Sequence, residues 1–293
     1  MLKKLFFIIL LSDFIFANYK FYNLNIPDSE YYLNPSDQTP PLSEKIALLG
    51  ANLSVYNYDE HDDLYNQSIS EFASDNGFTL KKNFFVNRIG VDDAISFFAL
   101  TKDIIVNGQY KELVVLSFRG TDNRNDKFTD ENFRKTSFTQ NSEVKVHNGF
   151  NNIIKLLESK ENETSFSDGS SLGSKINSGN TIFLLTGHGL GGAIATLYGA
   201  SLRERGVLKE NVLIYSFGSP AVGTVTFNNR YGIFSNETPM FHNRIVYDKD
   251  HVANLDTLDV VTVHQGLQRN LDSNGKWVQT FQNVMLKKHL PYL

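Results

Sequence analysis

The amino-acid sequence predicts an α/β fold in which helices flank a central, mainly parallel sheet. Two observations support this prediction. The apolar run 182–186 is followed by the glycine-dense stretch 187–192 and then by small and apolar residues at helical spacing, which indicates a buried strand, a tight turn and a helix. From residue 113 onward, predicted strands and helices alternate, as they do where helices connect parallel strands.

Composition excludes several classes of function. The 293 residues, 41% of them hydrophobic, suffice for one α/β domain or two small domains with a sizeable core. The formal net charge of −4 gives no basis for a nucleic-acid partner. The chain contains no cysteine, so disulfides, thiol nucleophiles and thiolate metal sites are excluded. We expect neither a metal nor a cofactor, and the oligomeric state stays open.

The N-terminal residues 1–17 have the pattern of an export signal peptide. Lys3 and Lys4 precede the apolar run 5–11, and Ala17 ends a sequence that fits a cleavage site. An N-terminal core helix is the alternative. Because the apolar run is too short to span a bilayer, we expect a soluble product in the periplasm or outside the cell.

Residues 18–41 are polar, aromatic and rich in proline, and we expect them to form an extended lead-in to one domain over 42–293. That domain opens with a helix over about 42–58. The buried stripe of this helix consists of Ile46, Leu49 and Leu53. The acidic run 58–63 contains a histidine, and we interpret it as solvated surface rather than as a metal site.

Three strands are expected in succession at 84–86, 94–100 and 113–118, and Asn107-Gly108 before the third is a hairpin turn signal. Further buried strands are expected after the central turn, at 212–217 and 244–247.

Two variable loops interrupt this pattern. The connection 122–145 is polar and charged, and long connections of this kind are usually functional or disordered. Residues 161–180 are rich in serine, glycine and asparagine, and we interpret them as a flexible surface insertion. The helix expected between the two loops, over 151–160, buries a face made of Ile153, Ile154 and Leu157.

The turn at 187–191 has the sequence of a nucleophile elbow, with one exception. In the G-x-S-x-G elbow of α/β-hydrolases, a strand turns sharply into a helix and exposes a serine hydroxyl at the turn. Here Gly189 stands where that serine is expected. The pattern therefore predicts the scaffold of an ester hydrolase without its nucleophile.

Five motifs, in order along roughly 42–293, resemble those of class 3 (fungal-type) lipases. They are Ser117-Phe118-Arg119-Gly120-Thr121, Val146-His147-Asn148-Gly149-Phe150, Gly187-His188-Gly189-Leu190-Gly191-Gly192, Ser216-Phe217-Gly218-Ser219-Pro220-Ala221-Val222-Gly223 and Arg244-Ile245-Val246-Tyr247-Asp248-Lys249-Asp250-His251-Val252. The resemblance implies an α/β-hydrolase fold and a site for carboxylic esters of lipids. It also implies a Ser-Asp-His triad in that chain order.

The resemblance assigns the remaining members of the site. Asp250 matches the acid, with Asp248 as the alternative, and His289 resembles the catalytic base, whereas His264 resembles a structural histidine. Backbone N–H groups of Thr121 and Leu190 match the oxyanion donors. The resemblance also places a lid directly after Thr121. Its phenylalanines, which we expect to contact acyl lipid or a lipid surface, are Phe128, Phe133 and Phe138.

Gly189 decides between possible functions. Without the serine we expect strongly impaired hydrolysis and retained lipid binding, which describes a pseudoenzyme or an enzyme of very low activity. One alternative is weak hydrolysis by a water molecule that His289 and Asp250 activate. Another is a non-catalytic module that binds a partner through 122–145 or 161–180. The acid and the histidine favour the first two hypotheses, because a binding module has no use for them.

Overall fold

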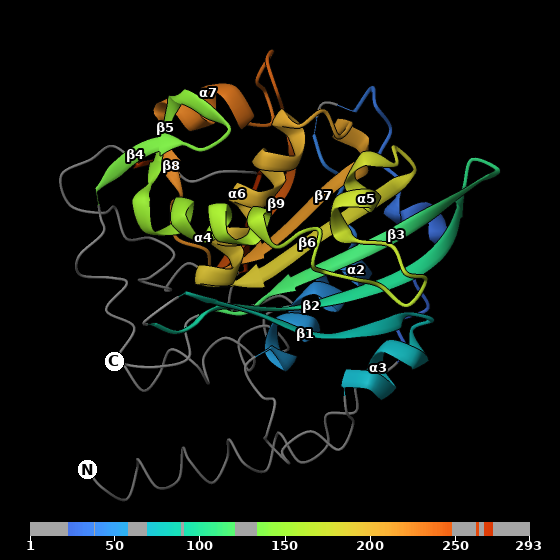
Figure 1. Cartoon of the computed structure of the whole chain (residues 1–293). Coiled ribbons are helices and arrows are strands. Elements are labelled where there is room, and N and C mark those ends of the chain that lie inside the picture. The colour runs from blue at the N-terminus through green and yellow to red at the C-terminus, as the bar shows by residue number, and fades with distance from the viewer. Residues whose placement is uncertain are drawn as a thin grey trace, which may run out of the picture.

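The computed structural model describes residues 23–37, 39–57, 69–88, 91–120, 134–247, 262–263 and 267–271. Two sheets organise them, a seven-stranded sheet in the order β1-β2-β3-β6-β7-β9-β11 and a four-stranded sheet in the order β10-β8-β5-β4 (Figure 1). The strands of the larger sheet are β1 (Thr79–Arg88), β2 (Val91–Val106), β3 (Gln109–Phe118), β6 (Thr181–His188), β7 (Val212–Phe217), β9 (Phe241–Tyr247) and β11 (Leu267–Leu271). Those of the smaller sheet are β4 (Lys135–Phe138), β5 (Asn141–His147), β8 (Gly223–Thr224) and β10 (Thr262–Val263).

The larger sheet is mainly parallel. The neighbours β1, β2 and β3 pair antiparallel, and every pairing from β3 through β6, β7 and β9 to β11 is parallel. Every residue of β6 and β7 is buried. Strands covered on both faces need continuous apolar runs, which is why these two strands could be recognised from the sequence. The predicted α/β class and its mainly parallel sheet are confirmed.

Helices cover both faces of this sheet. Alternate residues of β3 contact different cores: Leu116 and Phe118 pack in one core cluster with α4 (Asn148–Ser159) and α6 (Leu190–Glu204), and Val115 packs in the other with α2 (Glu44–Tyr56). The remaining short helices are η1 (Asp28–Tyr31), α3 (Ile69–Asp75), α5 (Leu172–Asn177), η2 (Lys209–Asn211) and α7 (Val225–Tyr231).

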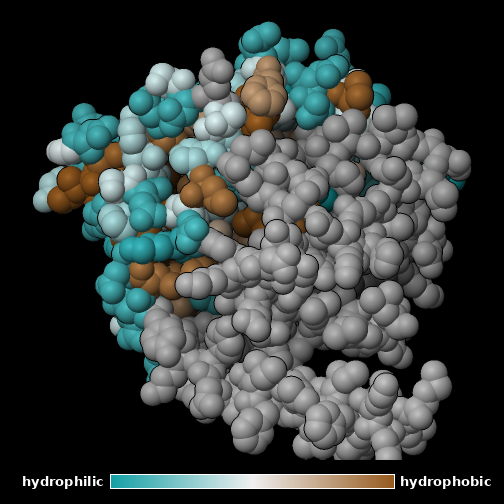
Figure 2. Space-filling view, turned by 180° about the vertical axis from the view of Figure 1, so that it is seen from behind, coloured by the Kyte–Doolittle hydropathy of each residue, from teal (hydrophilic) through white to brown (hydrophobic). Residues whose placement is uncertain are grey.

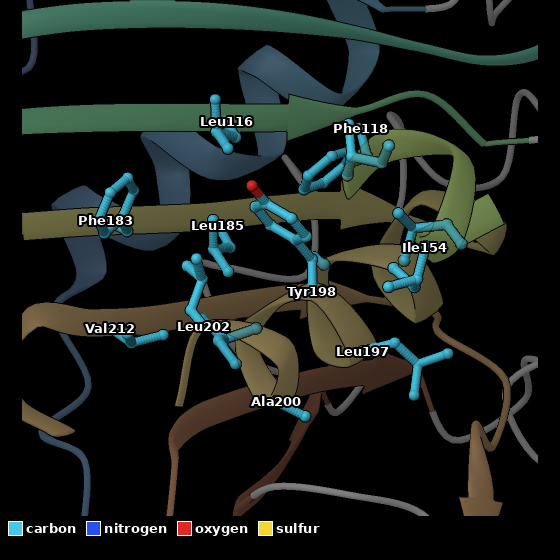
Figure 3. Packing of buried hydrophobic residues seen from close by; sticks show 14 of the residues in the cluster. Leu116, Phe118, Ile154, Phe183, Leu185, Leu197, Tyr198, Ala200, Leu202 and Val212 are labelled. Carbon is cyan, nitrogen blue, oxygen red and sulfur yellow. The ribbon is translucent and has the colours of Figure 1, made fainter. Parts of the chain in front are cut away.

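The α6 side of the core is built around aromatic packing. Tyr198 of α6 points toward the sheet beside Phe118 and Leu185, as Figure 3 shows. The ring centroids of Phe118 and Tyr198 lie 5.9 Å apart in an edge-to-face arrangement. The Tyr198 hydroxyl donates to Glu161 at 2.6 Å, and Glu161 also pairs with Arg205 at 2.7 Å. The polar atom of this buried tyrosine is therefore satisfied.

Two local predictions agree with the structure. Helix α2 ends at Tyr56, and the stripe predicted for it, Ile46, Leu49 and Leu53, is fully buried. At the β2–β3 turn, Asn107 and Gly108 have φ angles of 50° and 76°. Two successive positive φ angles fit the type I′ turn that an Asn-Gly pair favours in hairpins.

Both expected loops contain regular structure. Within 122–145, residues from Lys135 onward form β4 and part of β5, so this segment is not one continuous connection. Within 161–180, α5 carries a capping box at Ser171, and Phe166 and Leu172 are buried. The polar, glycine-rich composition of both segments gave no sign of these short strands and this helix in the sequence. Buried contacts with the domain hold them in place, so 161–180 is not a flexible insertion.

The described part of the lead-in, 23–37 with 39–41, is also corrected. It contains η1, and Tyr31 and Leu33 are each 1% exposed in the core cluster on the α2 side. This segment therefore packs against the domain that was expected to begin at residue 42. The predicted signal peptide, 1–17, lies outside the described residues.

The described surface carries few large apolar side chains. Those that are exposed are Leu42, Ile105, Tyr110, Leu208, Val225 and Phe234. Among the described residues on the face shown in Figure 2, hydrophobic residues form small groups separated by hydrophilic ones. Among the described residues, no helix has the length and apolar character needed to span a membrane.

Candidate active site

A strained turn joins β6 to α6 at Gly189. Its φ of 56° and ψ of −122° are rarely adopted by residues with a side chain. The Gly189 N–H donates to the carbonyl oxygen of Phe217 at 2.9 Å, and its own carbonyl oxygen accepts from Ala193 N–H at 3.1 Å. The peptide is thus held on one side by β7 and on the other by the first turn of the helix. This is the sharp strand-to-helix turn that the sequence predicts at 187–191.

The first turn of α6 lies directly against the end of β3. A Cβ atom at Gly191 would overlap the carbonyl oxygen of Phe118, the last residue of β3. A Cβ at Gly192 would lie 2.9 Å from the Cβ of Ser219. Glycines at these positions therefore let the helix approach both neighbouring strand ends. That contact brings the N-terminus of α6 beside the turn that follows β3.

Backbone donors point out of this helix end. Leu190, Gly191 and Gly192 precede Ala193, whose N–H makes the bond to Gly189. The first N–H groups of a helix have no partner within the helix and carry partial positive charge. Leu190 is partly buried. The end of α6 can therefore stabilise an oxyanion placed beside Gly189.

A buried histidine, His242, contacts Ser216 on the α6 side of the sheet, close to the turn. The Nε2 atom of His242 is 2.7 Å from the Ser216 hydroxyl, and Arg244 Nη2 donates to the Ser219 carbonyl oxygen at 3.0 Å. Burial, with the nearby Arg244 charge adding to it, lowers the pKa of His242 to about 3. This histidine is therefore neutral at physiological pH. The sequence analysis missed it, since only the pairing of β7 with β9 brings Ser216 and His242 together.

A second neutral histidine begins α4. His147 accepts a hydrogen bond from Phe150 N–H through Nδ1 at 3.4 Å, and its ring stacks on Phe150 with centroids 4.1 Å apart. Burial lowers the pKa of His147 to about 4. The side chain thus caps the helix and is uncharged at neutral pH.

The sequence pattern of the family described as Lipase (class 3) matches residues 115–260, a region that contains the Gly189 turn and the strands beside it. The chain belongs to the class 3 lipase family. The relationship to individual members is distant. A lipase from Rhizomucor miehei is 27% identical over 178 residues, which make up 60% of this chain and 46% of that protein.

Another relative is the secreted mono- and diacylglycerol lipase 1 of Fusarium solani, 34% identical over 119 residues, or 41% of this chain and 33% of that protein. The chain thus spans between a third and a half of the length of these curated relatives. One solved structure is a triacylglycerol lipase whose catalytic centre is described as a serine protease triad. It aligns with a TM-score of 0.60 and 20% identity over 80% of this chain and 83% of that one. The α/β-hydrolase fold is therefore shared.

The described part of this class 3 lipase chain contains only some of the predicted site residues. Gly189 and Leu190 lie together at the turn, as expected. The others, with their alternatives, fall outside the described residues: Thr121, Phe128, Phe133, Asp248, Asp250, His264 and His289. Phe138 is corrected. It is 1% exposed in β4, and its ring packs against Phe227 and Tyr231 with centroids 6.1 Å and 5.9 Å away, so it belongs to the core and not to a lid.

Hydroxyl side chains near the turn do not replace the missing serine. Thr186, Ser201 and Ser216 are each 0% exposed, and Ser219 is 2% exposed. A nucleophile must reach the carbonyl carbon of an ester bound at the turn. Thr186 lies within β6, Ser201 lies further along α6, Ser216 contacts His242 within β7, and Ser219 follows β7, so none of them stands at the apex of the turn. Among the described residues close to the turn, Gly189 therefore has no evident substitute.

Proposed function

We propose that this class 3 lipase homologue binds acyl lipids or lipid esters at the Gly189 turn and hydrolyses them very poorly. The observation that carries the proposal is a glycine at the apex of the strand-to-helix turn, in the backbone geometry of a nucleophile elbow. The scaffold of a lipid ester hydrolase is retained, and the atom that attacks the ester is missing.

The remaining roles follow from the chemistry of ester hydrolysis. His289 acts as the general base, Asp250 holds its tautomer, and the N–H groups of Leu190 and Thr121 stabilise the oxyanion. None of these roles uses the side chain at position 189. A serine restored there would therefore meet a site that is otherwise ready for catalysis.

Two further proposals concern the surroundings of the site. Phe128 and Phe133 contact lipid from a lid that follows Thr121. The protein is exported, a proposal supported by the basic and apolar start of the chain and by the name of the Fusarium solani relative, a secreted lipase.

Restoring the nucleophile tests the proposal. The unmodified protein should hydrolyse short-chain nitrophenyl esters barely above background. Gly189→Ser should raise the rate by several orders of magnitude, because removing the nucleophile of a serine hydrolase costs about 2 × 10⁶ in rate. Gly189→Ala is the matched control: it introduces the same backbone strain without a hydroxyl and should stay inactive.

Two histidine variants in the Gly189→Ser protein complete the test. His289→Ala should abolish the gained activity, and His264→Ala should leave most of it. Brisk hydrolysis by the unmodified protein would reveal another nucleophile. A folded but inert Gly189→Ser protein would contradict the proposed catalytic ancestry of the site and favour binding alone.

A further inference from the structure

Asn57 links the end of α2 to the end of β3. Its backbone N–H extends the helix by one hydrogen bond to Leu53 O at 3.2 Å. The residue is buried, with 2% of its surface exposed. The amide nitrogen Nδ2 donates to Ser117 O at 2.9 Å and lies 2.7 Å from Ser117 Oγ. One side chain thus holds the carbonyl oxygen and the hydroxyl of a residue 60 positions further along the chain.

The strand end that Asn57 holds is fixed from two other directions. Ser117 faces α2, whereas the next carbonyl oxygen, that of Phe118, lies against Gly191 of α6. The following N–H, that of Arg119, donates to Ser96 O of β2 at 2.9 Å. Contacts with α2, α6 and β2 therefore surround the last residues before the turn at Gly120.

The Asn57 amide acts as a donor. Its Oδ1 atom is buried and accepts no hydrogen bond from any described residue, while Nδ2 has three acceptors within reach. Leaving a buried polar atom unpaired is unfavourable. The described hydrogen bonds of this side chain are all made by its nitrogen, and two of the three go to Ser117.

We propose that Asn57 is a positioning residue, which holds the end of β3, up to Arg119, in place against the first turn of α6 beside Gly189. The inference rests on the proposed function, in which Thr121, shortly after Arg119 in the sequence, is an oxyanion donor. Oxyanion stabilisation requires donors that are already in place when charge develops. A residue that keeps the end of β3 in place against α6 is therefore expected to affect kcat and not substrate affinity.

Amide hydrogen exchange, measured with Gly189 unchanged, tests the positioning directly. In Asn57→Ala, amides at the end of β3 and at Arg119 should exchange about tenfold faster, since a buried donor to Ser117 is lost. Ser54→Ala is the matched control, because Ser54 is also buried in α2 but its hydroxyl donates to Gly50 O of its own helix, at 2.7 Å, and not to β3. It should leave the end of β3 unchanged.

Asn57→Ser provides a second variant in case alanine prevents folding. Its hydroxyl can bond to the Leu53 carbonyl within the helix, as Ser54 does to Gly50, but it is too short to reach Ser117. We expect it to behave like Asn57→Ala at β3. Equal exchange at β3 in the Asn57 and Ser54 variants would overturn the proposal and leave Asn57 as a helix-end residue only.

A kinetic measurement in the Gly189→Ser protein tests the consequence. Adding Asn57→Ala should lower kcat by about 10–100-fold with KM unchanged, less than the loss of a whole oxyanion donor, and adding Ser54→Ala should not. A fall in kcat shared by both variants would overturn the proposal. If Gly189→Ser is inert while Asn57→Ala still speeds exchange at β3, the proposed function fails and the positioning role of Asn57 stands.

Discussion

Gly189 is subject to two opposing effects of very different size. A residue with a side chain at this backbone geometry costs about 1–3 kcal/mol in strain. Glycine avoids this strain, but it lowers stability by about 0.4–1 kcal/mol because it gives the unfolded chain more conformational entropy. Under the proposed function, the effect on catalysis is far larger, because the loss of a serine nucleophile lowers the rate by about 2 × 10⁶, which corresponds to roughly 8–9 kcal/mol of barrier. Of the two effects of a glycine at this position, the proposed effect on the reaction is therefore much larger than the effect on stability.

His242 gives the protein a specific sensitivity to acid. An exposed histidine titrates near 6.5, whereas burial and Arg244 lower the pKa of His242 to about 3 in the folded state. Below pH 6.5 the His242 imidazole binds a proton in the unfolded chain but not in the folded protein. The free energy of unfolding therefore falls as the pH drops from about 6.5 to about 3. At 1.36 kcal/mol per pKa unit, the loss is on the order of 3–5 kcal/mol.

The prediction is checked by urea unfolding between pH 8 and pH 4. His242→Gln should have a lower free energy of unfolding at pH 8, because it loses the hydrogen bond between His242 and Ser216. Its stability should nevertheless fall less steeply with acid than that of the unmodified protein. His147→Gln is the comparison, since the pKa of His147 is lowered less, to about 4. The same pH slope with and without His242 would contradict the assignment.

At the scale of elements, the sequence predicted what is apolar and regular. The fully buried β6 and β7 were found because continuous apolar runs mark them. Helix α5 was missed because its stability comes from distant partners: Lys175 pairs with Glu112 of β3 at 2.5 Å and with Asp168 at 3.0 Å. The amino-acid pattern of one segment cannot indicate contacts with residues far away in the sequence.

The candidate site was predictable to a similar degree. Glycine spacing revealed the turn, because a Cβ at Gly191 would overlap the Phe118 carbonyl oxygen and because residues with a side chain rarely adopt the φ of Gly189. The contact of Asn57 with Ser117 was not predictable, since it joins a helix end to a strand end through tertiary packing. Phe138 was misassigned because its spacing from other phenylalanines says nothing of the direction in which its ring points.

The packing of α2 on β6 yields a prediction at this scale. A Cβ at Gly50 would lie 2.7 Å from Thr186 Oγ1 and 3.2 Å from Phe217 Cε2. Gly50→Ala gains about 1 kcal/mol in helix propensity, but forcing α2 off the sheet costs about 1–3 kcal/mol. We expect lower stability in thermal unfolding. In a Thr186→Ala background the cost should shrink, because the closest clashing atom is gone. An equal effect in both backgrounds would show that the clash is not with Thr186.

At the scale of the whole molecule, the segment before α2 ties distant parts of the domain together. Asp28 Oδ2 accepts from Ile105 N–H at the β2–β3 hairpin, at 2.9 Å. The Pro41 carbonyl oxygen accepts from Asn243 Nδ2 of β9, at 3.1 Å. Lys209, after α6, donates to the carbonyl oxygens of Pro35 and Asp37 at 3.1 Å and 3.0 Å. The segment therefore spans the α2 side of the sheet from its hairpin to β9.

Tyr31 tests whether the domain depends on this segment. It is 1% exposed in the core on the α2 side, so Tyr31→Ala should lower the free energy of unfolding by about 3–5 kcal/mol, as for other buried aromatic residues. Tyr32→Ala is the matched control, because the Tyr32 ring is only partly buried. This substitution should lower the free energy of unfolding by about 1 kcal/mol. Urea unfolding measures both. Small and equal effects would mean that 23–41 is dispensable and that the folding unit begins near residue 42, whereas a large effect of Tyr31 alone would make this segment part of the domain.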